Sequence, residues 1–407
     1  MLLSVNVSRL LFLFFTLFFS GIFGMTQAWA SEAALLEWET FLGGKEADRG
    51  FFAQQTDDGG FIVVGETSSY YMYGNGDNDV LVARLDSSGK LQWRRALGGV
   101  KKDSGVFVQQ TSDGGYIITG ATQSYRQGED NDIYLLKIDG SGRLQWQKSF
   151  GGLGDDYGAC VKQTSDGGFI ITGKTSSSGA GDFDLYLIKT DPSGKKEWEK
   201  TFGGKETDLG MFVIETLDGG YVVVGQTFSP FSGGFDIYLV KTGADGKKEW
   251  EKSYGGKGWE IAESLAQTCD GGYIITGQTS SFSDGSFDTY LLKIDATGTQ
   301  EWEKTFANNG WSTGKYVMET SDCGYLVAGW IDSGSINLVQ AHIFKTDANG
   351  SIIRELKYEK NKFNRDFFIY PVRDGGYIIT GWWAEPLRNN EYRNNGIQVY
   401  LAKLKAL

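Results

Sequence analysis

The sequence predicts an all-β fold, a seven-bladed β-propeller with four antiparallel strands per blade and an N-terminal strand that closes the last blade. Three observations predict it. A hairpin motif, DGG in six copies and DCG in one, recurs at a spacing of 52 to 55 residues. Each of the first six repeats contains four short runs rich in β-branched and aromatic residues, and helical periodicity is absent. The last repeat lacks a fourth run, which the start of the chain supplies.

The DGG motif predicts a tight turn between the first two strands of each repeat. In TSDGGYIITG, residues 111–120, the glycines allow the positive φ angles of such a turn. The aspartates of the seven copies are Asp58, Asp113, Asp166, Asp218, Asp270, Asp322 and Asp374. One hairpin alone buries too little apolar surface, so we expect seven units to stack around an axis and bury a continuous core.

The second repeat shows the four expected strands in order. They are GVFVQQT (105–111), GYIITGAT (115–122), DIYLLKID (132–139) and LQWQKSF (144–150). The third and fourth are joined by an Asp-x-x-Gly turn at residues 139–142.

The two ends of the chain predict how the ring closes. The seventh repeat stops after its third strand, IQVYLAKL (397–404), whereas LLEWETF (35–41) is a fourth-strand sequence without a blade. Pairing of these two segments completes seven four-stranded blades and leaves no open sheet edge.

The Asp-x-x-Gly-x-x-x-Trp pattern, as in Asp86, Gly89 and Trp93, resembles the tryptophan-docking repeat of quinoprotein-like propellers. With the FGG and DGGYIITG…YLLK segments, the whole unit is similar to secreted bacterial and archaeal β-propeller repeat proteins. This resemblance covers essentially all of residues 31–407 and implies the fold but little about function. An adjacent cysteine pair typical of many pyrroloquinoline-quinone alcohol dehydrogenases is missing. Gly243 replaces the motif's Asp and Arg354 its Trp, which leaves docking open in repeats four and six.

The first thirty residues predict a secretory signal peptide. Arg9 precedes an apolar run of about fifteen residues, and Ala28-Trp29-Ala30 fits a cleavage site. The alternative is an uncleaved anchor, but the run is short for a bilayer span. We therefore expect residues 31–407 to form a single propeller, secreted or periplasmic, with no stable membrane span after cleavage.

Charge and cysteine content narrow the class of partner. The chain has a net charge of −12 and shows no basic stripe, and both observations argue against nucleic acid as a partner. The three cysteines, Cys160, Cys269 and Cys323, replace other residues of the repeat, and their odd number predicts free thiols. A monomer is expected.

Acidic residues in phase with the blades have two interpretations. Five stand at the entry to the first strand: Asp48, Asp103, Asp156, Asp208 and Glu260. They could form a ring that holds calcium, but we favour side chains that cap backbone amides. Asp79, Asp132, Asp184, Asp236 and Asp288 form a second phased set, for which a turn role is again favoured. No cofactor is expected, and the single histidine, His342, is predicted to pack within a strand.

Departures from the repeat supply the candidate binding residues. Trp259, Trp311, Trp330, Trp382 and Trp383 lie outside the docking position, all in repeats five to seven. The long loops of repeats one and seven add Tyr71, Tyr73, Arg388, Tyr392 and Arg393. Strand directions place these residues on one face, where aromatic rings can stack on sugars or contact a peptide. The alternative is that the tryptophans fill gaps between atypical blades.

The sequence therefore favours a secreted, non-catalytic binding module that presents an aromatic, loop-rich face to a glycan or a protein. A polysaccharide-active enzyme is the rival hypothesis, because Asp332, Glu385 and Glu391 lie off the repeat phase, although no pair stands out. A structural platform for envelope assembly is a third hypothesis.

Overall fold

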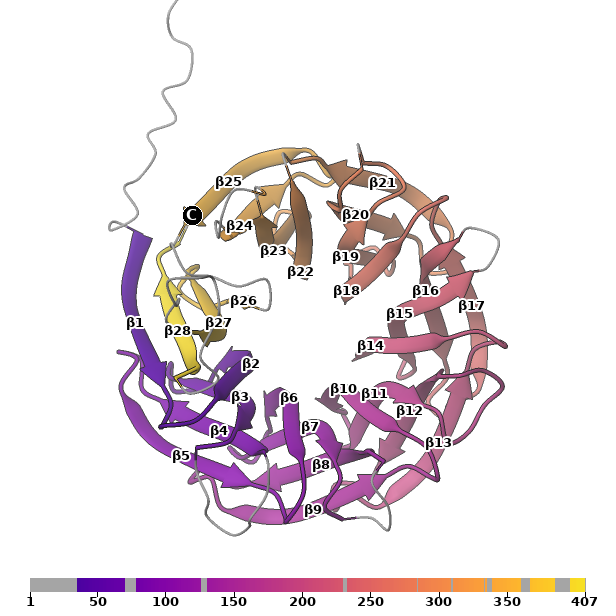
Figure 1. Ribbon diagram of the computed structural model, residues 1–407. Coiled ribbons are helices and arrows are strands. Elements are labelled where there is room, and N and C mark those ends of the chain that lie inside the picture. Colours follow the sequence, from indigo (N-terminus) through magenta and orange to yellow (C-terminus); the bar gives the residue numbers. More distant parts are fainter. Residues whose placement is uncertain are drawn as a thin grey trace, which may run out of the picture. The chain divides into compact units, whose positions relative to one another are not determined.

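The computed structural model describes residues 35–69, 78–125, 130–229, 233–283, 285–308, 310–332, 334, 339–359, 367–384 and 396–406. Within the unit Leu36–Leu407 these residues form seven four-stranded antiparallel sheets, the blades of a propeller (Figure 1). The described residues include no helix long and apolar enough to cross a bilayer. The predicted fold class is confirmed.

The first four blades follow the repeat in chain order. Blade 1 is β2 (Asp48–Gln55), β3 (Phe61–Thr67), β4 (Asp79–Leu85) and β5 (Leu91–Leu97). Blade 2 is β6 (Asp103–Gln110), β7 (Tyr116–Thr122), β8 (Asp132–Ile138) and β9 (Leu144–Phe150). Blade 3 is β10 (Asp156–Gln163), β11 (Phe169–Thr175), β12 (Asp184–Thr190) and β13 (Lys196–Phe202). Blade 4 is β14 (Asp208–Glu215), β15 (Tyr221–Ser229), β16 (Gly234–Thr242) and β17 (Lys248–Tyr254).

The remaining blades include the one that joins the two ends of the chain. Blade 5 is β18 (Glu260–Gln267), β19 (Tyr273–Thr279), β20 (Asp288–Ile294) and β21 (Gln300–Phe306). Blade 6 is β22 (Trp311–Glu319), β23 (Tyr325–Asp332), β24 (Val339–Thr346) and β25 (Ile352–Glu359). Blade 7 is β26 (Phe368–Pro371), β27 (Tyr377–Trp383), β28 (Gln398–Leu404) and β1 (Leu36–Leu42).

The N-terminal strand closes the ring as predicted. β1 pairs antiparallel with β28, with Leu36 opposite Leu404 and Leu42 opposite Val399, and the indigo and yellow strands lie together in Figure 1. The Lys403 ammonium also binds the Glu37 carboxylate at 2.7 Å. Glu197, Glu249 and Glu301 make the same contact with their own blades' lysines. β1 thus reproduces the chemistry of a fourth strand as well as its hydrogen bonds.

A cation on the third strand, buried in every blade except blade 6, holds the turn that carries the DGG motif or its DCG variant. In blade 2 the Lys137 ammonium lies 2.8 Å from the Asp113 carboxylate, which also accepts hydrogen bonds from Thr111 and the Gly115 amide. The other pairs are Arg84–Asp58, Lys189–Asp166, Lys241–Asp218, Lys293–Asp270, Lys345–Asp322 and Lys403–Asp374. The lysine of the YLxK segment and the aspartate of DGG therefore form one unit.

Tryptophan docking joins each blade except blade 6 to the following blade. A Cβ placed at Gly89 would lie 2.5 Å from the Trp38 ring, and Trp38 Nε1 donates to Ser87 O at 3.1 Å. Trp198 of blade 3 docks in the same manner on Gly246 of blade 4. The replacement of the motif's Asp by Gly243 in this turn therefore leaves docking intact. These turns need glycine because the indole occupies the space of a side chain.

Arg354 in place of Trp now has an explanation. The tryptophan of each blade docks on the turn between the third and fourth strands of the following blade. Blade 7 has no such turn, because its third and fourth strands, β28 and β1, belong to opposite ends of the chain. A docking residue in blade 6 would have no turn to contact.

Candidate functional site

Strand directions define two edges of the ring. The loop rim carries the connections into each first strand and those from each second to each third strand. The turn rim carries the DGG turns and the turns between third and fourth strands. Trp259 and Trp311 enter β18 and β22 at the loop rim, and Trp330 lies near the loop-rim end of β23. The predicted Tyr71, Tyr73, Arg388, Tyr392 and Arg393, with Glu385 and Glu391, lie outside the described residues.

Trp259 presents its indole at the junction of blades 4 and 5. Its amide donates to Ser280 Oγ at 2.7 Å, and its carbonyl accepts from the Ser280 amide at 2.8 Å, so its backbone is held from both sides. The ring is 40% exposed and packs edge-on against Phe235, with centroids 5.3 Å apart. Phe235 in turn contacts Phe228 at 5.4 Å. This is a fixed, accessible aromatic surface of the kind that ligands stack on.

Trp311 and Trp330 form a second aromatic group at the junction of blades 5 and 6. The Trp311 ring stacks on Phe287 with centroids 5.3 Å apart and donates from Nε1 to Gln278 Oε1 at 2.9 Å. Trp330, 5.9 Å from Trp311, is only 3% exposed, and its buried Nε1 has no hydrogen-bond partner in the described part of the chain. Packing between blades accounts for Trp330, whereas Trp311 keeps part of its ring in solvent.

Trp382 and Trp383 lie on opposite faces of blade 7, because they are consecutive residues of β27. The Arg49 guanidinium lies 6.0 Å from the Trp382 ring and pairs with Glu66 at 2.6 Å. Trp383 contacts Phe41 of β1 with centroids 5.4 Å apart. The five tryptophans are thus arranged as three local groups along the loop rim.

The phased acidic residues at the entry to each first strand cap backbone amides, as favoured from the sequence. Asp48 Oδ2 accepts from the Gly44 amide at 2.8 Å and from Ser69 Oγ at 2.7 Å. Asp103 repeats this pattern with Gly99 and Ser124. Asp156, Asp208 and Glu260 likewise accept amide hydrogens from the preceding loop. Hydrogen bonding accounts for the position of all five buried carboxylates.

The two phased acidic sets also meet each other, which the sequence did not reveal. A Cβ at Gly98 would lie 2.2 Å from Asp79 Oδ1 and 2.6 Å from Asp103 Oδ2, so two carboxylates flank one glycine. Burial and the charge of Asp103 raise the pKa of Asp79 to about 6. The same arrangement recurs as Asp132 with Asp156, Asp184 with Asp208 and Asp236 with Glu260. Each of the four junctions from blade 1 to blade 5 therefore holds a pair of buried or half-buried carboxylates.

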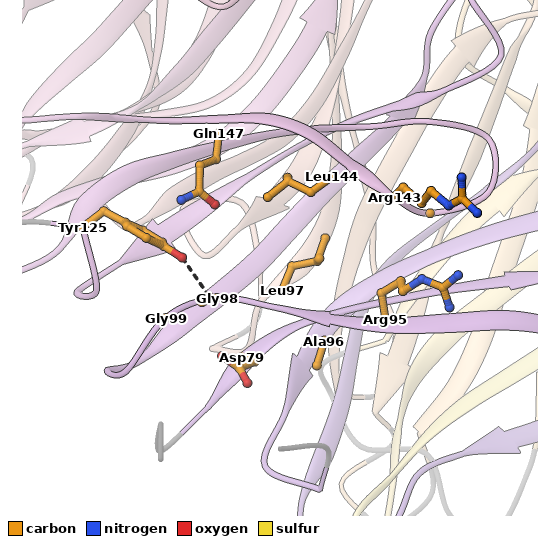
Figure 2. Close-up of a pocket in the computed structure, with 11 residues that line it drawn as sticks. Asp79, Arg95, Ala96, Leu97, Gly98, Gly99, Tyr125, Arg143, Leu144 and Gln147 are labelled. Atoms are coloured by element: carbon orange, nitrogen blue, oxygen red, sulfur yellow. Dashed lines mark hydrogen bonds between the residues drawn. The ribbon is translucent and has the colours of Figure 1, made fainter. Parts of the chain in front are cut away.

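A cavity of about 450 Å³ lies between blades 1 and 2. Figure 2 shows Arg95 and Arg143 at one end, Leu97 and Leu144 in the middle, and Tyr125 with Gln147 at the other end. Tyr125 Oη donates to Gly98 O at 2.7 Å. The volume is in the range of small-ligand pockets. Its residues belong to the repeat phase or to short loops, so nothing in their pattern singles them out, apart from arginine where other repeats have lysine.

Comparison with known proteins supports the fold only. No protein-family model matches the chain. The chain is 27% identical over 175 residues to the regulatory protein FlaEY of Caulobacter vibrioides, a match covering 37% of this chain and 18% of that protein. The chain thus spans less than a fifth of that curated relative.

Among solved structures, the polysaccharide lyase Uly1 superposes with a TM-score of 0.52 at 12% identity, covering 93% of this chain and 94% of that one. BBS1N, solved in complex with ARL6DN, gives a TM-score of 0.49 at 8% identity, covering 90% of this chain and 96% of that one. An ancestral GH74 enzyme gives 0.46 at 11% identity, covering 89% of this chain and 47% of that one. At such identities the likeness concerns architecture, and the chain has the fold of a seven-bladed β-propeller.

Proposed function

We propose that this protein is a secreted, non-catalytic binding module that presents its loop rim to a glycan or a protein partner. The observation that carries the proposal is Trp259, whose exposed ring is held by two backbone hydrogen bonds and by Phe235. Neither the ion pairs of the DGG turns nor the docking tryptophans require an aromatic residue there. The docking tryptophans themselves support placing the chain among quinoprotein-like propellers.

The chemistry of the loop rim suits a neutral or basic partner. An exposed indole offers a flat apolar face for the C–H groups of a sugar ring or for a peptide side chain. The net charge of −12 disfavours a strongly acidic polymer along the whole surface. Trp311 extends the aromatic surface toward blade 6.

A glycan-array screen of residues 31–407, followed by titration of the best ligand, tests this function. We expect Trp259→Ala to weaken binding about 10- to 30-fold, as for an aromatic hot spot. Two exposed leucines provide matched controls. Leu153 lies in the equivalent loop before blade 3, and Leu217 lies on the turn rim. Both alanine variants should bind like the wild type; equal affinity of the Trp259 variant would refute the proposal.

The alternative functions give different outcomes in parallel assays. A polysaccharide-active enzyme would release new reducing ends or unsaturated uronides from a polysaccharide panel. A structural envelope platform would bind no small glycan and would retain a defined envelope protein in a pull-down. Turnover without measurable binding at Trp259 would favour the enzyme.

The cavity between blades 1 and 2 supports a second candidate function, binding of a small acidic sugar. Arg95 donates to Ser141 O and is held over Trp93, whereas the exposed Arg143 faces the cavity beside it. Guanidinium groups beside leucine side chains suit a carboxylated ring. Isothermal titration with glucuronate and with glucose tests it: Arg143→Ala should abolish any preference for glucuronate, and equal affinities in the wild type would exclude it.

A further inference from the structure

Two cysteines that are far apart in the sequence meet at the junction of blades 5 and 6. Cys269 lies in the DGG turn between β18 and β19, and Cys323 in the turn between β22 and β23. Their Sγ atoms are 3.7 Å apart, and both residues are exposed at the turn rim. Cys160, the third cysteine, is fully buried in β10.

A repeated hydrogen bond brings these turns together. At several junctions between blades, a Gln or Glu at the end of one blade's first strand accepts a hydrogen bond from a backbone amide in the DGG turn of the preceding blade. Glu319 accepts from the Cys269 amide at 2.8 Å, and Gln163 accepts from the Ser112 amide at the same distance. At the junction of blades 7 and 1, the side chains of Arg373 and Asp57 form an ion pair across the turns. Side-chain bonds between neighbouring turns are therefore sterically feasible.

Cys323 occupies a backbone conformation that the repeat reserves for glycine. Its φ is 59°, and it is the only non-glycine residue with positive φ among the described residues. Gly59, Gly114, Gly167, Gly219, Gly271 and Gly375 fill the equivalent position in the other turns. A Cβ in the left-handed region costs roughly 1 kcal/mol. A contact made by the thiol would offset this cost.

A metal site is the other chemistry that this cluster suggests. Cys269, Glu319 and Cys323 offer three ligand atoms within 4.8 Å of one another. However, structural zinc sites use four protein ligands. The Glu319 carboxylate already has the amide-capping role that the equivalent glutamines have at other junctions. The position of Glu319 therefore needs no metal to explain it. Only the two neighbouring thiols still need an explanation.

We propose that Cys269 and Cys323 form a disulfide that staples blade 5 to blade 6. The two thiols lose two protons and two electrons to a disulfide oxidant, such as oxidised glutathione or an oxidoreductase disulfide, which is reduced to two thiols as the Sγ–Sγ bond forms. The two exposed sulfurs, 3.7 Å apart, have to close to the S–S bond length of about 2.05 Å. An exported protein meets such oxidants. The staple fixes the junction whose loop-rim end carries Trp311.

Thiol counting on the native protein tests the bond directly. Hydrogen bonding to Glu319 and the nearby Cys323 raise the pKa of Cys269 to about 11, so oxidation by oxidised glutathione is best run near pH 8.5. We expect two alkylatable thiols in the reduced native protein and none after oxidation. Trypsin should then yield peptide 258–293 linked to peptide 316–345, lighter than their sum by two hydrogens. Two persistent thiols, or stoichiometric zinc that blocks oxidation, would overturn the proposal.

Thermal unfolding measures what the staple does. Oxidised wild type should melt roughly 3–6 °C above the reduced protein, because the bond closes a long loop. Cys269→Ser should show no difference between the two conditions. Cys323→Gly restores the residue of the other repeats and should also abolish the difference without lowering the Tm of the reduced protein. Cys160→Ala keeps the pair and should retain the full shift; the same Tm in oxidised and reduced wild type would contradict the proposal.

Discussion

The four junctions from blade 1 to blade 5 differ from the junction between blades 5 and 6 at several residues that contact one another. In the first group, paired carboxylates such as Asp79 and Asp103 flank a glycine that has no room for a Cβ. Between blades 5 and 6, Ser312 replaces the second carboxylate and Ala307 replaces that glycine. The backbone amide of the next residue, Asn308, donates to Asp288 Oδ1 at 3.1 Å, and its side-chain amide donates to Ser312 Oγ at 3.3 Å.

This difference separates what the ring requires from what a single blade can vary. Where two carboxylates crowd this glycine, a Cβ has no room; where only one remains, the glycine can be replaced, as by Ala307 at the junction of blades 5 and 6. At the junction of blades 7 and 1, Gln398 stands beside Asp48, so only one charge remains there as well, although Gly43 is kept. The junctions with fewer buried charges are those that carry Trp311, Trp330 and Trp382. These junctions in the later part of the ring therefore have fewer buried charges and more aromatic packing than the earlier junctions.

The closure between blade 7 and β1 should be the most sensitive part of the ring. Deleting residues 31–42 removes the partner of β28 and the Glu37–Lys403 ion pair, and it exposes the edge of blade 7. We expect a fall in Tm of roughly 15 °C or more, or aggregation, because an unpaired strand edge remains. Circular dichroism melts and light scattering measure both effects.

A circular permutant is the matched control for this deletion. It starts at Gly43 and carries residues 36–42 after Leu404, joined by a copy of the turn at residues 139–143. Because Leu36 pairs with Leu404, the added turn has the register of the other blades. The permutant should melt within a few degrees of the wild type. A deletion variant as stable as the permutant would show that closure contributes little.

Tryptophan docking should distinguish the regular blades from blade 6. Trp198→Ala removes a half-buried ring that packs on Gly246 and Tyr221, and we expect a loss of roughly 2–4 kcal/mol in the free energy of unfolding. Arg354→Ala, at the equivalent exposed position, should change it by less than about 0.5 kcal/mol. Urea denaturation of both variants checks the difference. In the permutant, which gains a docking turn in blade 7, Arg354→Trp should be stabilising; no gain there would contradict the docking explanation.

The fold could be predicted from the sequence because each signal is local and repeated. The DGG turn, the strand runs and the unpaired LLEWETF segment each point to the same arrangement, and the β1–β28 register confirmed it. The reason for Arg354 could not be read from its own repeat. It depends on the missing turn of the following blade, which only the closed ring reveals.

The candidate site could be predicted only in part. Trp259 and Trp311 were found because they depart from the repeat, and both lie at the loop rim as expected. Phe235 and Phe287 were missed, although they are aromatic residues close to the start of third strands, Phe235 within β16 and Phe287 just before β20, and could have been noticed there. Residues such as Asp79 and Asp103, or Cys269 and Cys323, meet only across a junction. These pairs are separated by about half a repeat and about one repeat in the sequence, and neither separation indicates a contact.

The carboxylate pairs predict that a neutral substitution stabilises a regular junction. Asp79 is 8% exposed, its Oδ1 has no hydrogen-bond partner among the residues that the structure describes, and its pKa is raised to about 6 in the folded state. Its contribution to stability is therefore full below about pH 4 and is lost as the pH rises through 6. Asp79→Asn should raise the free energy of unfolding at pH 7 by roughly 1–2 kcal/mol and flatten its pH dependence between 4 and 7.

Asp288→Asn is the matched control at the junction of blades 5 and 6. Asp288 faces Ser312 and Asn308 rather than a second carboxylate, so no like charge is relieved. We expect no gain in the free energy of unfolding at pH 7. A small loss is expected because a neutral side chain at position 288 is a weaker acceptor for the Asn308 amide than the carboxylate. Guanidinium denaturation at several pH values compares the two variants. Equal stabilisation by both would mean that burial alone, and not the paired charge, disfavours Asp79.

The smallest expected effect concerns His342, which replaces a tyrosine of the regular blades. Tyr186 donates to Glu199, whereas His342 Nε2 lies 2.7 Å from Glu355 and its ring packs on Phe344, 4.9 Å away. The smaller imidazole leaves room for Phe344 where blade 3 has Ile188.

His342→Tyr alone should therefore overpack blade 6 and cost about 1 kcal/mol, and adding Phe344→Leu should recover most of that loss. Burial lowers the pKa of His342, so the wild type loses stability as the pH falls below about 6.5. The double variant lacks this imidazole and should lose less stability than the wild type between pH 7 and 5. A pH series of urea midpoints for the three proteins measures both effects. If the double variant followed the wild-type profile, the acid sensitivity would belong to other groups, and His342 would be a packing residue alone.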